Sequence, residues 1–378
     1  MNILIAPDSY KESLTSLQVS KYIKKGILNV SKKHNIKIIP LADGGEGTVN
    51  SIVSATNGKI INKTVIGPLG KKVNGLFGII NNGKTAVVEM ASASGLQLIP
   101  MDKRDPTITT TYGTGQLIKE ALSYGIEDII IGIGGSATND AGVGMAQALG
   151  VKFLDKNNND IEFGGRNLNK IKKINIKNID PRINDIDIKV ACDVNNPLYG
   201  ENGAAYVYAP QKGADSKMVT VLDENLRYFN DIVKKELDMN LNKIKGAGAA
   251  GGLGAGLVAF LNAELYNGIE LILDIVKFNH YVKNVDLVIT GEGKLDGQSV
   301  NGKTPVGVAR RAKKYGKPVI AIVGSLGKDV HNVLDEGIDS YFPIIDKPDC
   351  LKSIMNRSQE LLINTTEQII RSINIFNE

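Results

Sequence analysis

A glycine-rich stretch with two carboxylates lies at residues 288–299, and its residue types point to a specific chemistry. A short aliphatic run, residues 287–289, ends in a loop in which Glu292 and Asp296 flank a lysine. Ligands of open α/β sheets bind at the carboxyl ends of the strands. Glycine lets backbone amides approach a phosphate, and carboxylates hold magnesium. We therefore expect magnesium-nucleotide chemistry here, with Gly291 at the nucleotide and Glu292 and Asp296 near the metal.

A second loop of the same kind follows a predicted strand at residues 36–39. In this loop Asp43 and Glu46 bracket two glycines. A helix is expected next, and one of the two acids could simply cap that helix. A cap explains one acid and leaves the other without a role, so Asp43 is predicted as a further carboxylate near the metal.

The segment after the first predicted strand, residues 8–13, offers a cation. Lys11 could meet a phosphate or a carboxylate as a mobile point charge. Ser9 and Glu12 have the spacing of a capping box, and we favour that structural role for these two residues.

Gly134, Gly135 and Ser136 follow a predicted strand at residues 129–133. A strand, a glycine turn and a helix place free amides and the positive end of the helix dipole at an anion, so these residues are predicted to bind one. The pattern is not a Walker A loop, because Gly-Lys-Ser/Thr does not follow at the required offset. Asp140 is either a helix cap or a carboxylate of the site.

Two other strand ends carry polar side chains. Asp193 follows a predicted strand, and its carboxylate could take the proton of a substrate hydroxyl, as the catalytic aspartate of kinases does. The alternative is an Asx-turn. Ser94 ends a hairpin strand and could bind a small polyhydroxy acid, although the sequence alone favours an ordinary turn there.

The segment Gly246–Gly256 contains the spacing G-x-G-x-x-G. Residues 241–245 make a poor strand, which weakens a dinucleotide-binding interpretation. We interpret Gly248 and Gly251 as part of a phosphate or adenine loop, with tight packing by small residues as the alternative. No Ser-His-Asp or Cys-His arrangement is visible, which argues against nucleophilic hydrolysis.

Composition narrows the class of protein. The chain has 378 residues, 42% of them hydrophobic and only 5% aromatic, which fits an α/β enzyme of about two domains. The net charge of +5 is spread among acidic residues, so no nucleic-acid partner is expected. No apolar run reaches the length of a membrane span. Two cysteines without metal-type spacing fit a reducing compartment, and the protein is expected in the cytoplasm.

Strands and helices alternate at both ends of the chain. Strands are predicted at residues 3–6, 36–39, 285–289, 319–323 and 341–345, and helices around residues 19–30, 306–314 and 330–336 and from about residue 351. Turn signals within residues 63–88 predict antiparallel hairpins instead. Helices are predicted around Leu117–Tyr124, ended by Gly125, and along the apolar positions of residues 219–233.

This order predicts an α/β protein of two α/β domains. One is doubly wound, with a discontinuous chain of residues 1–65 and 280–378. The other is an inserted mixed-sheet domain of residues 66–279. Residues 110–150 could belong to either domain.

Six motifs in register resemble the type I glycerate kinase family; they lie at residues 7–11, 42–47, 110–115, 134–140, 192–194 and 291–298. The resemblance implies transfer of the γ-phosphoryl group of ATP to D-glycerate with Mg²⁺, usually giving 2-phosphoglycerate. It also implies two α/β domains, one of them flavodoxin-like, with the active site in the cleft between them. Gln116, where an acid is expected, is a small departure in a helix start.

The roles of single residues are hypotheses. Asp43, Glu292 and Asp296 would surround the magnesium-phosphate, and Asp193 would be the base toward glycerate. Lys11, with Arg104 as a further candidate, would neutralise a phosphate or the glycerate carboxylate. Two other classes stay open, a nicotinamide-dependent oxidoreductase of a small hydroxy acid and a non-catalytic sugar-acid binding protein. The choice of 2- or 3-phosphoglycerate and the oligomeric state, with a homodimer as one alternative, also stay open.

Overall fold

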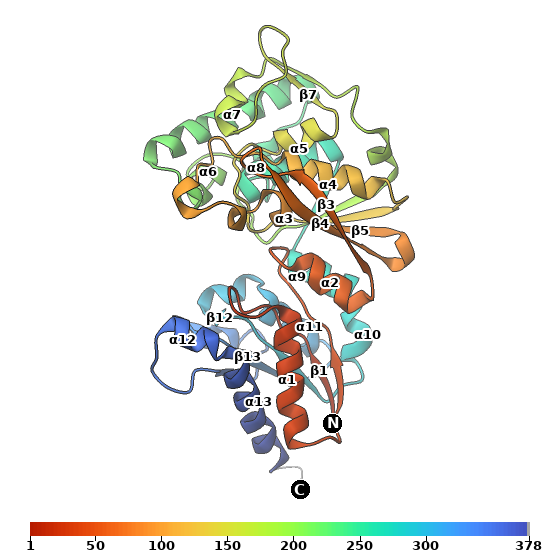
Figure 1. Cartoon of the computed structure of the whole chain (residues 1–378), viewed down its shortest axis with the longest axis vertical. Helices are drawn as coiled ribbons and strands as arrows, with labels where there is room; N and C mark the ends of the chain where they lie inside the picture. The colour runs from red at the N-terminus through yellow and green to blue at the C-terminus, as the bar shows by residue number, and fades with distance from the viewer. Residues whose placement is uncertain (376–378) are drawn as a thin grey trace. The chain divides into compact units, whose positions relative to one another are not determined.

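The computed structural model describes residues 1–375 and divides the chain into two compact units (Figure 1). Unit 1 contains residues 1–43, residues 50–57 and the chain from Ile269 onward. Unit 2 contains residues 44–49 and 58–268. Residues 110–150, which the sequence left unassigned, lie wholly in unit 2.

Unit 1 is built on a five-stranded parallel sheet with the order β15-β13-β11-β1-β2. Numbered along the unit, this is the strand order of flavodoxin-like folds, which confirms the predicted doubly wound architecture. The order reverses between β1 and β11, so this pair marks the switch point where such folds bind ligands. The strands are β1 (Asn2–Ile5), β2 (Asn35–Ile38), β11 (Leu287–Thr290), β13 (Val319–Val323) and β15 (Ser340–Pro343), with a separate pair β12 (Lys294–Leu295) and β14 (Ser325–Leu326).

Two helices, α1 (Ser16–Val30) and α13 (Ser358–Asn374), pack side by side on one face of this sheet (Figure 1). A Cβ on Gly26 of α1 would lie 2.7 Å from Ile363 O and from Thr366 Cβ of α13, so only glycine allows the helices this close. Ile3 and Ile5 point to this core, while Leu4 between them is equally buried on the opposite face. The remaining helices of the unit are α9 (Gly268–Ile275), α10 (Phe278–Val282), α11 (Thr304–Lys313) and α12 (Leu351–Asn356), and α2 (Thr48–Thr56) has residues in both units.

Unit 2 is built on a six-stranded mixed sheet with the order β10-β9-β6-β5-β4-β3. The first four strands in this order run parallel, and β3, β4 and β5 form the antiparallel hairpins that the turn signals predicted. The strands are β3 (Lys59–Ile66), β4 (Lys72–Ile80), β5 (Thr85–Glu89), β6 (Asp128–Gly132), β9 (Asp187–Ala191) and β10 (Glu264–Tyr266), with a separate hairpin of β7 (Lys152–Leu154) and β8 (Lys173–Asn175).

The helices of unit 2 bury the apolar positions that the sequence spacing selected. The predicted amphipathic helix is α7 (Ser216–Leu237), and its positions Val219 and Phe229 are at most 6% exposed. Gly125, in the left-handed region with φ 69°, follows the end of α4 (Tyr112–Leu122) as predicted. The other helices are α3 (Ala91–Ser94), α5 (Val143–Ala148), α6 (Ala204–Tyr208) and α8 (Ala249–Leu261).

The structure corrects several predictions about helix ends. Ser9 and Glu12 form no cap for α1, because that helix begins at Ser16 with a capping box of Thr15 and Gln18. Residues 330–333 form only a 3₁₀ turn, and the C-terminal helix is two helices, α12 and α13. The first error is local, since Thr15 and Gln18 have the same capping-box spacing as Ser9 and Glu12.

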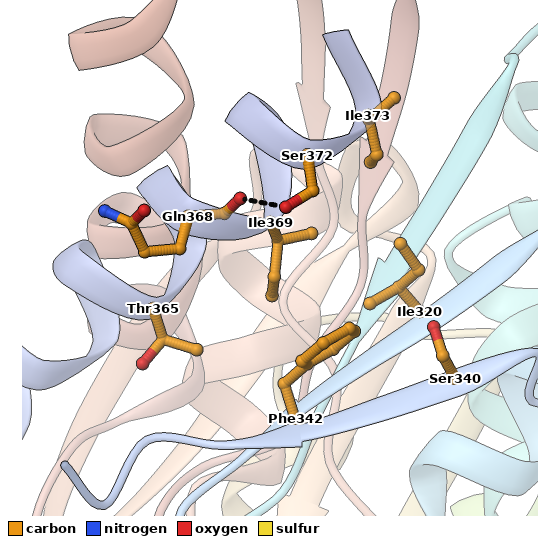
Figure 2. A pocket seen from close by; sticks show the side chains of 8 residues that line it. All are labelled: Ile320, Ser340, Phe342, Thr365, Gln368, Ile369, Ser372 and Ile373. Carbon is orange, nitrogen blue, oxygen red and sulfur yellow. Dashed lines mark hydrogen bonds between the residues drawn. The ribbon is translucent and has the colours of Figure 1, made fainter. Parts of the chain in front are cut away.

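A cavity of about 420 Å³ opens between the edge strand β15, β13 and α13 (Figure 2). Its walls are mostly apolar, and its polar side chains are uncharged; Ser372 donates its hydroxyl hydrogen to Gln368 O across 3.0 Å. The lining residues are Ile320, Ser340, Phe342, Thr365, Gln368, Ile369, Ser372 and Ile373. With no acid, base or cation in its wall, this cavity is no candidate for phosphoryl transfer. Among residues 1–375, no helix is both long and apolar enough to cross a membrane.

Candidate active site

The switch point of unit 1 brings together two loops that are far apart in the sequence. Asp8 follows β1, and its amide donates to Gly291 O, just beyond β11, across 2.8 Å. Gly291 itself is fixed by packing, since a Cβ there would lie 1.9 Å from Ile322 O of β13. The next residue, Glu292, is therefore held beside Asp8 at the carboxyl edge of the sheet.

Asp8 is a carboxylate that the sequence reasoning did not select. It is 9% exposed, and Thr304 donates its hydroxyl hydrogen to Oδ2 across 2.6 Å. Burial, followed by the nearby charge of Asp43, raises the pKa of Asp8 to about 7. The available signal was its position, because an acid directly after the first strand of a doubly wound sheet stands where ligands bind.

Glu292 has the same kind of environment. It is half-buried and accepts a hydrogen bond from Ser299 Oγ across 2.7 Å. Burial raises its pKa to about 7, and the charges of Asp8 and Asp296 contribute in the same direction. Asp43 thus raises the pKa of Asp8, and Asp8 and Asp296 raise the pKa of Glu292, so a cation would be favoured among these acids.

Asp296 and Asp43, the other two carboxylates predicted near the metal, have lysine partners. Asp296 caps the 3₁₀ helix that starts at Gly297, and lies 3.5 Å from Lys294 Nζ and 3.6 Å from Lys303 Nζ. Asp43 Oδ2 lies 3.9 Å from Nζ of Lys11, whose side chain is 82% exposed. Lys11 is therefore beside the acidic loops, with the mobility that a solvent-exposed side chain retains.

The three predicted metal ligands, Asp43, Glu292 and Asp296, do not converge on one preformed metal site. Within residues 1–375, no three His, Cys, Asp or Glu side chains converge closely enough to hold a metal ion. Mg²⁺ usually takes only one or two protein carboxylates and completes its shell with water and substrate phosphates. The buried Asp8 and the half-buried Glu292, with Asp43 close to Asp8, fit that mode of binding.

In unit 2, the predicted site residues gather at the carboxyl edge of the parallel strands. Gly134, Gly135 and Ser136 follow β6, and Ser94 follows β5. The two loops are joined, since Leu96 N donates to Gly135 O across 2.9 Å and Ala137 N donates to Ser94 O across 3.0 Å. The structure thus brings Ser94 to the predicted anion loop, although Ser94 itself is buried and shares a hydrogen bond of 2.9 Å with Thr114.

No helix dipole acts at this loop, which corrects one part of the prediction. Helix α5 begins only at Val143, beyond Asp140. Asp140 is 1% exposed and accepts from the amides of Gly142 and Gly144 and from the amide and hydroxyl of Thr111. Asp140 is not the N-cap of α5, which is Gly142, but its carboxylate binds backbone amides at the start of that helix, so these bonds support a structural role.

Asp193 is exposed at the carboxyl end of β9. Its Oδ1 accepts the amide of Gly268, after the neighbouring strand β10, across 2.7 Å. This bond joins the loops that follow two neighbouring strands, so the side chain is oriented by a tertiary contact. An exposed carboxylate is open to a substrate hydroxyl, which a general base must reach.

The loop that begins with Gly44 lies across these strand ends. Gly134 N donates to Gly44 O across 3.1 Å, and a Cβ on Gly134 would lie 2.7 Å from Gly45 Cα. Glu89, at the end of β5, accepts the amide of Val49 across 3.2 Å and also bonds to the amides of residues 47 and 48. The start of α2 is therefore capped by Glu89, and neither Asp43 nor Glu46 is needed for that role.

The glycine-rich segment of α8 is packed against protein backbone. Gly248 and Gly251 are buried, and a Cβ on them would lie 2.2 Å from Pro197 O and 1.9 Å from Thr138 O. A dinucleotide-binding fold requires a strand directly before the glycines. Here a 3₁₀ turn at Leu241–Lys243 precedes them instead. These contacts favour the packing interpretation over a nucleotide loop.

Unit 2 contains two cations of interest, of which Lys212 contacts the anion loop. Arg104 is half-buried, and its Nε has no hydrogen-bond partner within the described part of the chain. Lys212, which the sequence reasoning missed, is 3% exposed and donates from Nζ to Ser136 Oγ and to Thr138 O, both across 2.7 Å. No local pattern marks Lys212, because its partners lie more than seventy residues away.

Comparisons with known proteins agree with these motifs. The model of the glycerate kinase family matches residues 3–374. A glycerate kinase of Haemophilus influenzae is 51% identical over 371 residues, covering 98% of each chain. The glycerate 2-kinase of Escherichia coli K12 is 52% identical over 345 residues, covering 91% of each. A crystal structure described as a candidate glycerate kinase 2 of Salmonella typhimurium LT2 superposes with a TM-score of 0.89 at 44% identity, covering 100% of this chain and 99% of that one. The chain therefore belongs to the glycerate kinase family.

Proposed function

We propose that the protein transfers the γ-phosphoryl group of ATP to D-glycerate, with Mg²⁺, and forms 2-phosphoglycerate. The single observation that carries this proposal is the placement of Asp8 and Glu292 at the β1/β11 switch point of a chain in the glycerate kinase family. Phosphoryl transfer depends on positioning and on neutralising charge, and buried acids at a ligand-binding edge suit a magnesium-phosphate group.

The residues of unit 1 hold the metal and the phosphates in this proposal. Asp43, Glu292 and Asp296 were selected from the sequence, and Asp8 joins them because it lies beside Asp43 and Glu292. Magnesium bound there would neutralise charge on the transferred phosphoryl group. Lys11 supplies a mobile positive charge next to Asp43.

The other residues selected from the sequence act on the acceptor in this proposal. Asp193 takes the proton of the glycerate hydroxyl as the hydroxyl oxygen bonds to phosphorus and ADP leaves. Gly134, Gly135 and Ser136 bind an anionic group through amides and a hydroxyl, and Arg104 stays a further candidate for neutralising it. The two free thiols, Cys192 and Cys350, are compatible with a cytoplasmic enzyme.

The test is ADP release from ATP and magnesium, with and without D-glycerate. Glycerate-dependent ADP release is expected, and the phosphorus NMR spectrum of the product should show a phosphate on the 2-position. A product phosphorylated at the 3-position would reject that part of the proposal. Equal ADP release with and without glycerate, from well-folded protein, would reject glycerate as the acceptor.

A further inference from the structure

A buried lysine lies directly beneath the predicted anion loop of unit 2. Lysine is almost never fully buried unless its ammonium group is paired. Lys212 ends a 3₁₀ turn, Pro210–Lys212, and both acceptors of its Nζ, Ser136 Oγ and Thr138 O, belong to that loop. Gly135, the residue next to Ser136, is exposed. The lysine therefore contacts the buried side of a loop in which Gly135 is exposed and Ser136 is 8% exposed.

The bond from Lys212 decides which way the hydroxyl of Ser136 points. An ammonium group only donates, so it occupies a lone pair of Ser136 Oγ. The hydroxyl hydrogen of Ser136 must then point away from Nζ, and it is available to an acceptor outside the loop. A hydroxyl that accepts from a cation is also polarised and becomes a stronger donor.

The charges around Lys212 leave its ammonium group incompletely satisfied. Asp140 is the nearby acid, and its oxygens accept from backbone amides and from Thr111. Lys212 uses two of its three N–H groups on partners within residues 1–375. Burial lowers the pKa of Lys212 to about 7, and the charge of Asp140 opposes this shift only in part.

Further polar groups of the same loop are buried without partners. Thr138 Oγ1 and both amide atoms of Asn139 make no hydrogen bond within the described part of the chain, and both residues are 0% exposed. Burying such groups is unfavourable unless a water or a ligand satisfies them. The loop thus has buried hydrogen-bond donors and acceptors that the described part of the protein leaves without partners.

We propose that Lys212 is a positioning residue for an anion-binding site on the Gly134–Ser136 loop, where it turns the Ser136 hydroxyl outward to donate to a substrate anion. The chemical class of the ligand is a carboxylate or phosphate oxygen. The choice between the glycerate carboxylate and a phosphate of ATP rests on the proposed function. Because a bound anion favours the charged lysine, binding also takes up protons near neutral pH.

The experiment measures the dissociation constants of D-glycerate and of magnesium-free ATP separately, by calorimetry. The variants are Lys212→Met, Lys212→Arg, Ser136→Ala and the double variant of Lys212→Met with Ser136→Ala. Lys217→Met, at an exposed lysine nearby, is the matched control. Thermal unfolding of each variant shows whether it is folded.

Lys212→Met and Ser136→Ala should each weaken binding of the same ligand by about tenfold or more. The double variant should be no weaker than the poorer single variant, because the lysine acts through the serine. Lys212→Arg should restore part of the loss, and Lys217→Met should bind like the wild type. Weakened glycerate binding identifies a carboxylate site, and weakened ATP binding identifies a phosphate site.

Wild-type affinity for both ligands in folded Lys212→Met would overturn the inference. If Lys212→Met does not fold, the inference is tested by the affinity of Ser136→Ala and by the pH dependence of ligand binding to the wild-type protein. The affinity of the wild type for the affected ligand should fall between pH 6 and pH 8, because Lys212 loses its proton. This fall should be larger than the change that ionisation of the ligand alone would cause. Unchanged affinity in Ser136→Ala, or no such dependence, would reject the inference. Lack of glycerate-dependent ADP release would reject the proposed function alone, and the ATP measurements would still test Lys212.

Discussion

The hydroxyl of Thr304 donates a hydrogen bond to Oδ2 of Asp8 across 2.6 Å and so ties the first residue of α11 to the carboxylate that follows β1. Both residues are buried, and they stand 296 positions apart in the chain. The bond lowers the pKa of Asp8 against the larger opposite effect of burial. It therefore stabilises a charge at the switch point that the surrounding protein otherwise disfavours.

Replacing Thr304 by valine should test how much this charged hydrogen bond contributes. At pH 8, where Asp8 is mostly ionised, Thr304→Val should lower the free energy of unfolding by about 1.5–3 kcal/mol. The matched control is Thr366→Val in α13, because Thr366 is equally buried but donates to the neutral Leu362 O. Its loss should be smaller, about 0.5–1.5 kcal/mol. If urea unfolding gives equal losses in the free energy of unfolding for the two variants, the charge of Asp8 does not strengthen the hydrogen bond from Thr304.

Asp193→Asn should remove the proposed base while keeping the fold. The Oδ1 atom of asparagine can still accept the amide of Gly268, so the loop after β9 should keep its place. We expect kcat to fall by about 10²–10⁴-fold with the affinity for ATP unchanged. Asp187→Asn, at the exposed start of the same strand, is the control and should retain full turnover. Turnover of Asp193→Asn within a few-fold of the wild type would assign the base elsewhere.

Glu89 should make the stability of the protein depend on pH. Burial raises its pKa in the folded state to about 7, above the value of 4.5 for an unperturbed glutamate. The folded state therefore holds the proton more tightly than the unfolded state. This contribution is complete below about pH 4.5 and is lost as the pH rises through 7, by roughly 3 kcal/mol at most.

The measurement is urea unfolding of the wild type and of Glu89→Gln from pH 5 to pH 8. Glutamine keeps an oxygen for the amides at the start of α2 but cannot ionise. The stability of the wild type relative to the variant should fall as the pH rises. If stability depends on pH in the same way in the two proteins, Glu89 has the same pKa in the folded and unfolded states.

Gly134→Ala should disturb the contact between two site loops. The added Cβ would lie 2.7 Å from Gly45 Cα, and a backbone atom cannot move away as a flexible side chain can. Overpacking of this kind costs about 1–3 kcal/mol and should also lower kcat/KM, because the Gly44–Gly45 loop must shift. Gly70→Ala is the control for backbone strain, since its φ is +75° but its Cβ would meet nothing within 4 Å. If folded Gly134→Ala keeps the kcat/KM of the wild type, the contact between Gly134 and the Gly44–Gly45 loop is not needed for activity.

The sequence alone determined many of the elements and most of the loops of the site. The apolar spacing of residues 219–233, the hairpin turns within residues 63–88 and the strand–helix alternation at both ends depend on local periodicity, which a sequence displays directly. The carboxylates and glycines after the strands were visible for the same reason. Glu292, Asp43, Asp193 and Ser136 could therefore be selected by residue type and position.

Only the tertiary structure decided which of these residues meet and which others join them. Asp8 becomes part of the acidic site because β1 pairs with β11, and Glu89 caps α2 because β5 ends beneath the Gly44–Val49 loop. Lys212 reaches Ser136 from 76 residues away. The glycines of α8 proved to be packing residues because backbone from other segments fills the space beside them. Such contacts depend on how distant segments pack, and packing leaves no periodic signal in the sequence of either segment.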